Sequence, residues 1–245
     1  MKKNAFTLAE VLITLGIIGV VAAMTLPTLI QNYQKQVYVN GLKKAISTSQ
    51  NMLKQMQADE GASDLSSTKL FMDGVRNVGT LEEDSYGNLN PVGDDIYGNP
   101  EVFAELIPKY IKVIKTCRAD ACSQQYTIAR LTHNNNKTQN VQVKTAANVW
   151  EAWQDQNDKV KNAIIGFYTV DGPIYYIAPR AGYGPDKPNY IPLGVIVMVD
   201  VNGNKGPNIQ NVDLFSFVIN YNGVIDDLYS DSVFYLMSNG WKMDY

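Results

Sequence analysis

Four oxygen-bearing side chains near the C-terminal end have the residue types of a calcium-binding loop. Asp200, Asn202 and Asn204 alternate along the chain, as oxygen ligands do at the start of an EF-hand loop, and Asp213 follows shortly after. The positions at which that motif requires glycine and glutamate carry other residues. A plain hairpin loop, in which Asn and Gly take left-handed conformations, explains the same residues. We favour the hairpin loop and keep a Ca²⁺ site as the second interpretation.

The two cysteines of the chain, Cys117 and Cys122, are separated by the short sequence RADA. If this part of the chain is exported, it meets an oxidising compartment, where a disulfide bond is the default state. A zinc site has little support, because His133 is the single histidine and zinc takes four ligands. The spacing also differs from that of a redox-active CxxC pair. We therefore expect a Cys117–Cys122 disulfide.

No group of residues in the sequence indicates catalysis or nucleic-acid binding. With one histidine, in the Asn-rich stretch around His133, neither a Ser-His-Asp nor a Cys-His arrangement has support. Phosphate-binding and dinucleotide-binding glycine motifs are missing. The formal net charge is −3 and no run of Lys or Arg stands out, so we expect no nucleic-acid partner. The sequence therefore favours a protein that is not an enzyme.

Glu10 is the only formal charge in a nearly continuous apolar stretch that runs from Phe6 to Ile30. A helix of this length extends beyond the roughly 30 Å hydrocarbon core of a membrane. Lys2 and Lys3 precede the stretch, so we expect the rest of the chain to be translocated. A carboxylate inside a membrane helix is a functional hypothesis by default, and no Lys or Arg lies within the stretch to pair with it. A main-chain amine, created by cleavage before Phe6, is the nearest candidate partner.

The leader MKKNA, followed by FTLAE and an apolar helix, resembles the class III signal of type IV pilins and type II secretion pseudopilins. The resemblance implies that a prepilin peptidase cuts between Ala5 and Phe6 and methylates the new amine. It also implies that Glu10 pairs with the N-terminus of a neighbouring subunit, and Pro27 matches a proline of the family. The family usually has glycine before the cut, whereas this chain has Ala5. Pseudopilins of this family often hold Ca²⁺ in C-terminal β-region loops.

The same resemblance implies the partners and the location of the protein. The partners are further copies of this chain, other pilin-like subunits, the prepilin peptidase and an inner-membrane assembly platform. The subunit would first be a single-pass protein of the bacterial inner membrane with its C-terminal domain outside the cytoplasm. It would then enter a periplasmic or cell-surface filament, either a secretion pseudopilus or a pilus.

Several other interpretations of the chain stay open. An ordinary secretory signal peptide could be cut near Ala22 and Ala23, which would leave an exported enzyme. A plain membrane anchor would make the exported part an adhesin or a glycan-binding module. Trp150 and Trp153 could then stack on a sugar ring, although an apolar helix face is the commoner explanation for two such residues.

The apolar pattern divides the chain into a leader at 1–5, a transmembrane helix at 6–30, an amphipathic continuation at 31–60 and a globular domain at 61–245. Pro27 is expected to kink the helix and Gly61 to end it. The continuation carries apolar and small residues mostly at spacings of three and four, which predicts packing on the protein's own sheet rather than a coiled coil. These residues are Tyr33, Val37, Leu42, Ala45, Ile46, Ser49, Met52, Leu53 and Met56.

The remaining pattern predicts short helices followed by a β-rich C-terminal part. Helices are expected at 68–76, at 101–114 with Asn99 as the cap, and at 146–161, with short strands at 126–131 and 141–143 around a polar loop. Strands are expected at 164–170, 174–178, 193–201 and 212–219. Hairpin signals are present at Asp171-Gly172 and Asn222-Gly223, and a further segment at 229–236 follows the second of them. One long helix packed on antiparallel strands is an α+β fold, which is also what the family resemblance implies.

Overall fold

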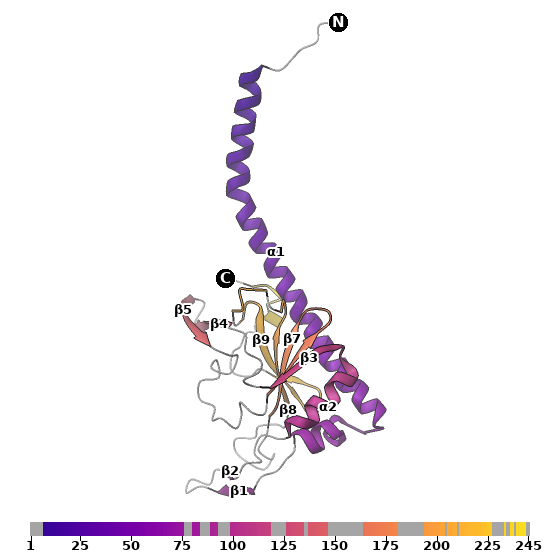
Figure 1. Ribbon diagram of the computed structural model, residues 1–245. Helices are drawn as coiled ribbons and strands as arrows, with labels where there is room; N and C mark the ends of the chain where they lie inside the picture. The colour runs from indigo at the N-terminus through magenta and orange to yellow at the C-terminus, as the bar shows by residue number, and fades with distance from the viewer. Residues whose placement is uncertain are drawn as a thin grey trace.

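The computed structural model describes residues 7–75, 80–83, 89–92, 99–118, 126–134, 137–146, 164–180, 194–203, 205–209, 211–226, 233, 236–237 and 239–243. The long helix α1 (Leu8–Asp59) leads into an antiparallel sheet, which confirms the predicted α+β class. Figure 1 shows that the N-terminal half of α1 projects alone from the rest of the molecule, whereas its C-terminal half lies along the sheet.

Helix α1 continues through Pro27 without a break. In Figure 1 its N-terminal and C-terminal halves run in different directions. The kink expected at Pro27 itself stays a prediction. The helix ends where the sequence predicted, because Gly61 takes a positive φ of 60° and the N–H of Glu60 closes the last turn on the carbonyl of Met56.

The C-terminal half of α1 buries one face, as its amphipathic pattern predicted. The buried residues recur every three or four positions: Val39, Leu42, Ala45, Ile46, Ser49, Met52, Leu53 and Met56. They belong to one core with apolar residues of the sheet, so the helix packs on its own domain. The predicted stripe started too early, because Tyr33 is 67% exposed and Val37 44% exposed. Both precede Val39, the first buried residue of α1, so they lie before the part of the helix that the sheet covers.

The main sheet of the described residues has six antiparallel strands in the order β10-β9-β8-β7-β6-β3. Their bounds are β3 (Val113–Arg118), β6 (Ile165–Thr169), β7 (Ile174–Arg180), β8 (Gly194–Asp200), β9 (Leu214–Asn220) and β10 (Ile225–Asp226). The hairpins between β6 and β7 and between β8 and β9 confirm the strands predicted at 164–170, 174–178, 193–201 and 212–219. Of the segment 229–236, only Val233 and Leu236 are described, and both are helical rather than extended.

Strands β8 and β9 are buried on both of their faces. Every residue of β8 and β9 is buried, and odd-numbered residues such as Val197 and Phe217 join the core that includes α1. Opposed pairs such as Val197↔Phe217 put an aromatic side chain beside a β-branched one, a favourable cross-strand combination. The β8–β9 hairpin therefore fixes the ends of the loop at 201–213.

Short helices cover the end of the sheet that lies beside the C-terminus of α1. A 3₁₀ turn, η1 (Leu65–Ser67), and a π-helical segment, η2 (Leu70–Val75), precede α2 (Pro100–Tyr110). Asn99 caps α2 as predicted, since its Oδ1 accepts the N–H of Glu101 at 3.0 Å. Helix α2 is shorter than predicted: Val113 and Ile114 belong to β3, because pairing with β6 takes over directly after the helix.

Two separate hairpins complete the described structure. Strands β1 (Thr80–Glu83) and β2 (Leu89–Val92) form one of them, in a region to which the sequence pattern assigned neither a helix nor a strand. Strands β4 (Tyr126–Asn134) and β5 (Lys137–Ala146) form the other. They are longer than predicted, and residues 132–134 of the expected polar loop are paired, with His133 opposite Thr138. Most of the predicted helix at 146–161, including Trp150 and Trp153, lies outside the described residues, and Ala146 belongs to β5.

Candidate functional site

The N-terminus of α1 is closed by a reciprocal pair of hydrogen bonds between Thr7 and Glu10. The backbone N–H and the hydroxyl of Thr7 each donate to Oε2 of Glu10 at 2.9 Å, and the N–H of Glu10 donates to Oγ1 of Thr7 at 3.3 Å. This is a capping box, which satisfies donors that have no partner inside the helix. The Glu10 side chain therefore already has a local role in a single subunit.

Thr7 is the functional residue that our sequence analysis missed. The signal was present, because Thr7-Leu8-Ala9-Glu10 has the capping-box spacing directly before an apolar run. The sequence predicts a charged partner for Glu10, whereas its partner in the structure is the neutral Thr7. Oε1 of Glu10 accepts no hydrogen bond from the described residues.

The N-terminal half of α1 is an apolar surface that the rest of the protein leaves uncovered. Its most hydrophobic window has a mean hydropathy of 2.2 and is 0% buried, which makes α1 a candidate membrane span. Large side chains along it are strongly exposed, for example Leu8 at 78%, Ile18 at 62% and Leu29 at 66%. At about 1.5 Å per residue, Leu8–Ile30 is roughly 35 Å long, which matches a hydrocarbon core of about 30 Å. Ala5 and Phe6 lie outside the described residues, so the predicted cleavage site stays a prediction.

A second candidate site lies in the loop between β8 and β9, where Asp200 and Asp213 are both 0% exposed. Asp213 accepts the N–H of Asn208 on Oδ2 at 2.8 Å and the N–H of Ile209 on Oδ1 at 2.6 Å. Asp200 accepts the N–H of Asn202 on Oδ1 at 3.2 Å, the pattern of an Asx turn. Burial raises the pKa of Asp213 above its ordinary value, although these backbone hydrogen bonds oppose the shift.

The β8–β9 loop is anchored to α1 through Asn202 and Tyr38. Asn202 donates from Nδ2 to the carbonyl of Gly206 at 3.1 Å, and its side chain also bonds that of Tyr38. Partial burial, together with the nearby charges of Asp213 and Asp200, raises the pKa of the Tyr38 hydroxyl. Oδ1 of Asn202 and Oδ1 of Asn208 are buried and have no hydrogen-bond partner among the described residues.

The structure thus brings Asp200, Asn202 and Asp213 of the predicted Ca²⁺ site together in one loop. Asn204 lies outside the described residues. Oxygen atoms of carboxylates, side-chain amides and backbone carbonyls are the ligands that Ca²⁺ prefers. Within the described residues no cluster of three or more His, Cys, Asp or Glu side chains is close enough to hold a metal, so any site here needs amide or carbonyl oxygens as well.

Cys117 is 5% exposed near the end of β3, where it is paired with Gly166 of β6. Cys122 lies outside the described residues. The Cys117–Cys122 disulfide therefore stays a prediction. His133 belongs to β4, but its surroundings are not described.

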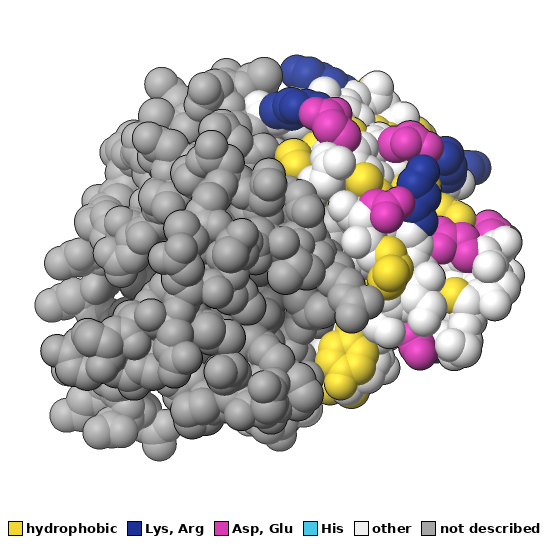
Figure 2. Space-filling view, turned by 90° about the horizontal axis from the view of Figure 1, so that it is seen from below, with side chains coloured by type: hydrophobic (Ala, Val, Ile, Leu, Met, Phe, Trp, Pro, Cys, Tyr) yellow, Lys and Arg dark blue, Asp and Glu magenta, His cyan; other side chains and the backbone are white. Residues whose placement is uncertain are grey.

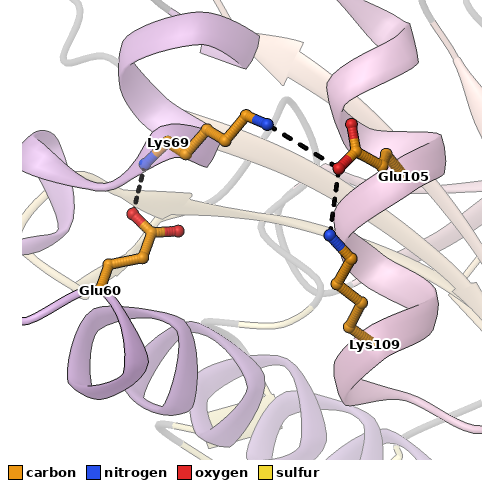
Figure 3. A network of polar contacts seen from close by, with 4 residues as sticks. All are labelled: Glu60, Lys69, Glu105 and Lys109. Carbon is orange, nitrogen blue, oxygen red and sulfur yellow. Dashed lines mark hydrogen bonds and ion pairs between the residues drawn. The ribbon is translucent and has the colours of Figure 1, made fainter.

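The end of the molecule far from the apolar helix half carries charges of both signs. Figure 2 shows Lys and Arg side chains interspersed with Asp and Glu over its described part. In the network of Figure 3, Glu105 pairs with Lys109 at 3.0 Å and with Lys69 at 3.8 Å, while the backbone N–H of Lys69 donates to Glu60 at 2.6 Å. The Lys109 hydrogen bond and the Lys69 charge lower the pKa of Glu105.

Comparison with known proteins identifies the N-terminal feature. The prokaryotic N-terminal methylation motif, which is the signature of type IV pilins and pseudopilins, matches residues 1–26. The match covers the leader, the Thr7–Glu10 capping box and most of the uncovered apolar half of α1. No curated protein and no solved structure matches the chain.

Proposed function

We propose that this protein is a structural subunit of a type IV pilus-like or type II secretion pseudopilus filament. The observation that carries the proposal is a methylation motif on an apolar helix half that its own domain leaves uncovered. A signal peptide that is removed would not need to continue without a break into the amphipathic half that packs on the sheet. The continuity of α1 therefore favours a helix that stays part of the mature protein.

Maturation would separate the leader from the helix. A prepilin peptidase would cut between Ala5 and Phe6 and methylate the new amine of Phe6, as the motif implies. The precursor would be held in the inner membrane by Leu8–Ile30, with the sheet domain outside the cytoplasm. Lys2 and Lys3 on the leader agree with this orientation, because positive residues stay on the cytoplasmic side.

Assembly would cover the apolar half of α1 with the same half of other subunits. Each Å² of apolar surface removed from water contributes about 25 cal/mol, so exposed side chains such as Leu12, Ile17 and Ile18 favour a bundled core outside lipid. Oε1 of Glu10 would accept a hydrogen bond from the Phe6 amine of a neighbouring copy and so select the stagger between subunits. Other pilin-like subunits and an inner-membrane assembly platform are the further partners.

Mass spectrometry of the mature protein tests this proposal. We expect an N-terminus at a methylated Phe6, and accumulation of the full-length precursor in cells that lack the prepilin peptidase. A matched comparison is Ala5→Gly, which restores the residue that the family usually has and should not slow cleavage. An intact Met1 in cells with the peptidase, or a start near Met24, would contradict the proposal.

We propose separately that the β8–β9 loop binds Ca²⁺ through Asp200, Asn202, Asn204 and Asp213. The supporting observation is the placement of two fully buried carboxylates in one loop, beside a buried Asn202 oxygen that has no partner among the described residues. A divalent cation would compensate the buried negative charge. The alternative is a plain loop in which the carboxylates only hold backbone N–H groups.

Thermal unfolding with and without Ca²⁺ separates these two alternatives. A ligand that binds the folded state alone raises the melting temperature by mass action. We expect a chelator to lower the melting temperature, and Asp200→Ala to remove the response to Ca²⁺. Asp64→Ala is a matched control, since Asp64 is an exposed carboxylate that caps η1 far from the loop. Identical melting curves in Ca²⁺ and in chelator would leave the hairpin loop alone.

A further inference from the structure

A cavity of about 410 Å³ lies beside α1 directly after its uncovered apolar half. Tyr33, Gln34 and Val37 line it from the helix, and the β6–β7 turn and the β8–β9 loop line it from the sheet domain, the latter including Lys205. Our sequence analysis assigned Tyr33 and Val37 to the core, yet both are exposed here. These two side chains therefore line the cavity and do not belong to the core.

The position of the cavity along α1 sets its depth relative to a membrane. When Leu8–Ile30 spans the hydrocarbon core, the following turn lies among the lipid head groups, which add roughly 5–8 Å on each side of the core. Tyr33 rises only about 4.5 Å beyond Ile30. An exposed tyrosine at this level is typical of the aromatic belts of membrane proteins. The part of the cavity that Tyr33 and Gln34 line is therefore at head-group depth.

Asp171 and Lys205 are the two charged side chains that line the cavity, and Asp200 and Asp213 lie near Tyr38 and Asn202 of its wall. Asp171 in the β6–β7 turn forms an ion pair with Lys44 of α1, which neutralises its carboxylate. Lys205 is exposed and forms no ion pair with any described residue. Its flexible stem allows the ammonium group to reach a phosphate at the level of the membrane surface.

We propose that this cavity binds the head group of a phospholipid from the leaflet that faces the globular domain. Lys205 contacts the lipid phosphate, and Tyr33 and Gln34 contact the interfacial part of the same lipid. The contact exists while the subunit is anchored in the membrane and is lost when the subunit leaves it. This inference rests on the membrane-anchored precursor of the proposed function.

A second cavity on the same helix supplies a matched control. It measures about 320 Å³ and is lined by Gln50, Leu53 and Lys54 of α1, among others. Lys54 lies roughly 36 Å beyond Ile30 along the helix, far outside the head-group layer. Both cavities thus lie beside α1 and each has a lysine in its lining, but they differ in their distance from the membrane.

The test uses full-length protein in nanodiscs of phosphatidylethanolamine and phosphatidylglycerol. One photoreactive lipid carries its reactive group on the head group, and a second carries it at the end of an acyl chain. Mass spectrometry then identifies the labelled peptides. We expect the head-group probe to label peptides from 33–38 and 201–206 but not from 50–57, and the acyl probe to label 8–30. Lys205→Gln should lower head-group labelling of 201–206 about fivefold, the loss expected for one lysine at a membrane surface, whereas Lys54→Gln should change nothing.

The outcomes distinguish this inference from the function on which it rests. Labelling of 8–30 by the acyl probe, with no head-group labelling of 33–38 or 201–206, overturns the lipid site and leaves the anchored precursor intact. Equal head-group labelling of wild type and Lys205→Gln also overturns it, because nearness to the bilayer alone would then explain the signal. A failure of the acyl probe to label 8–30 would contradict the membrane-anchored precursor itself.

Discussion

Gly41 of α1 lies directly against Val201, which follows β8: a Cβ atom on residue 41 would be only 2.8 Å from the Cβ of Val201. The helix therefore approaches the β8–β9 loop as closely as a glycine allows. This contact holds α1 beside the loop that carries the candidate Ca²⁺ ligands, and both of these elements line the proposed lipid cavity. The close approach explains why a residue with low helix propensity stands in the middle of a long helix.

Gly41→Ala should destabilise the fold by roughly 1 kcal/mol. Overpacking costs about 1–3 kcal/mol, and replacing a helical glycine by alanine returns about 1 kcal/mol. The atom that would clash is the Cβ of Val201, which cannot move without its backbone. Denaturant unfolding of the full-length protein in detergent measures the difference. A gain of about 1 kcal/mol, the helix-propensity value alone, would show that the contact relaxes freely.

Ser49→Ala should stabilise the protein by about 1 kcal/mol. Ser49 is 0% exposed, and its hydroxyl has no hydrogen-bond partner among the described residues. A buried polar group without a partner costs about 1–3 kcal/mol, and alanine also has the higher helix propensity. Ser47→Ala is the control, because Ser47 is an exposed serine on the same helix. Equal effects of the two substitutions in denaturant unfolding would mean that burial at Ser49 contributes nothing.

Stability should fall at alkaline pH through Tyr175. Burial to 2% exposure raises the pKa of its hydroxyl to about 12, although a hydrogen bond with the Thr48 side chain opposes this shift. A phenol whose pKa is higher in the folded chain than in the unfolded one stabilises the fold fully below pH about 10. This contribution, roughly 2–3 kcal/mol, disappears as the pH rises from about 10 to about 12.

Unfolding of wild type and Tyr175→Phe across that pH range measures the contribution of Tyr175. The difference in unfolding free energy between them should shrink as the pH rises above 10. Tyr33→Phe is the control, since it removes the same hydroxyl from an exposed side chain outside the core. The same pH dependence in all three proteins would assign the alkaline effect to other groups.

The sequence predicted best where one periodic pattern extended over several turns or a whole strand. The stripe of α1 from Leu42 to Met56 and the β8–β9 hairpin follow directly from apolar spacing. Tyr33 and Val37 were assigned wrongly, because helical spacing does not tell where the sheet that covers the helix begins. Tertiary pairing decided the other errors: Ile114 continues a helical pattern, but it lies in β3 between Val113 and Lys115, which pair with β6.

The candidate sites were predictable to different degrees. Glu10 and the β8–β9 loop could be found because charges are conspicuous in an apolar run or at alternating positions. Thr7 was overlooked although its spacing to Glu10 was visible. The lipid cavity could not be predicted, since Tyr33, Asp171 and Lys205 come from three distant parts of the chain and meet only in the folded protein.

The capping box gives Glu10 two possible roles, which two substitutions separate. Glu10→Gln can keep the reciprocal hydrogen bonds with Thr7, because glutamine serves at this position of a capping box. It removes only the negative charge. Glu10→Val removes both the charge and the cap. A comparison of the two therefore asks whether assembly needs the cap or the carboxylate.

We expect both Glu10→Val and Glu10→Gln to be inserted in the membrane and cleaved, yet to be missing from filaments. The carboxylate that would accept the Phe6 amine of a neighbour is lost in each, and an unpaired amine in the apolar core penalises the correct stagger. Membrane insertion should not suffer, because each change removes a charge from an apolar helix.

Fractionation of cells into membrane and sheared-filament pools measures the incorporation of both variants. Thr7→Val is the matched control, since it weakens the cap and keeps the carboxylate, and it should still enter filaments. Normal incorporation of Glu10→Gln would show that the charge is dispensable and that Glu10 acts through the cap it forms with Thr7. Loss of Glu10→Val from the membrane pool as well would instead assign Glu10 a role in targeting or folding, because a variant that never inserts cannot report on assembly.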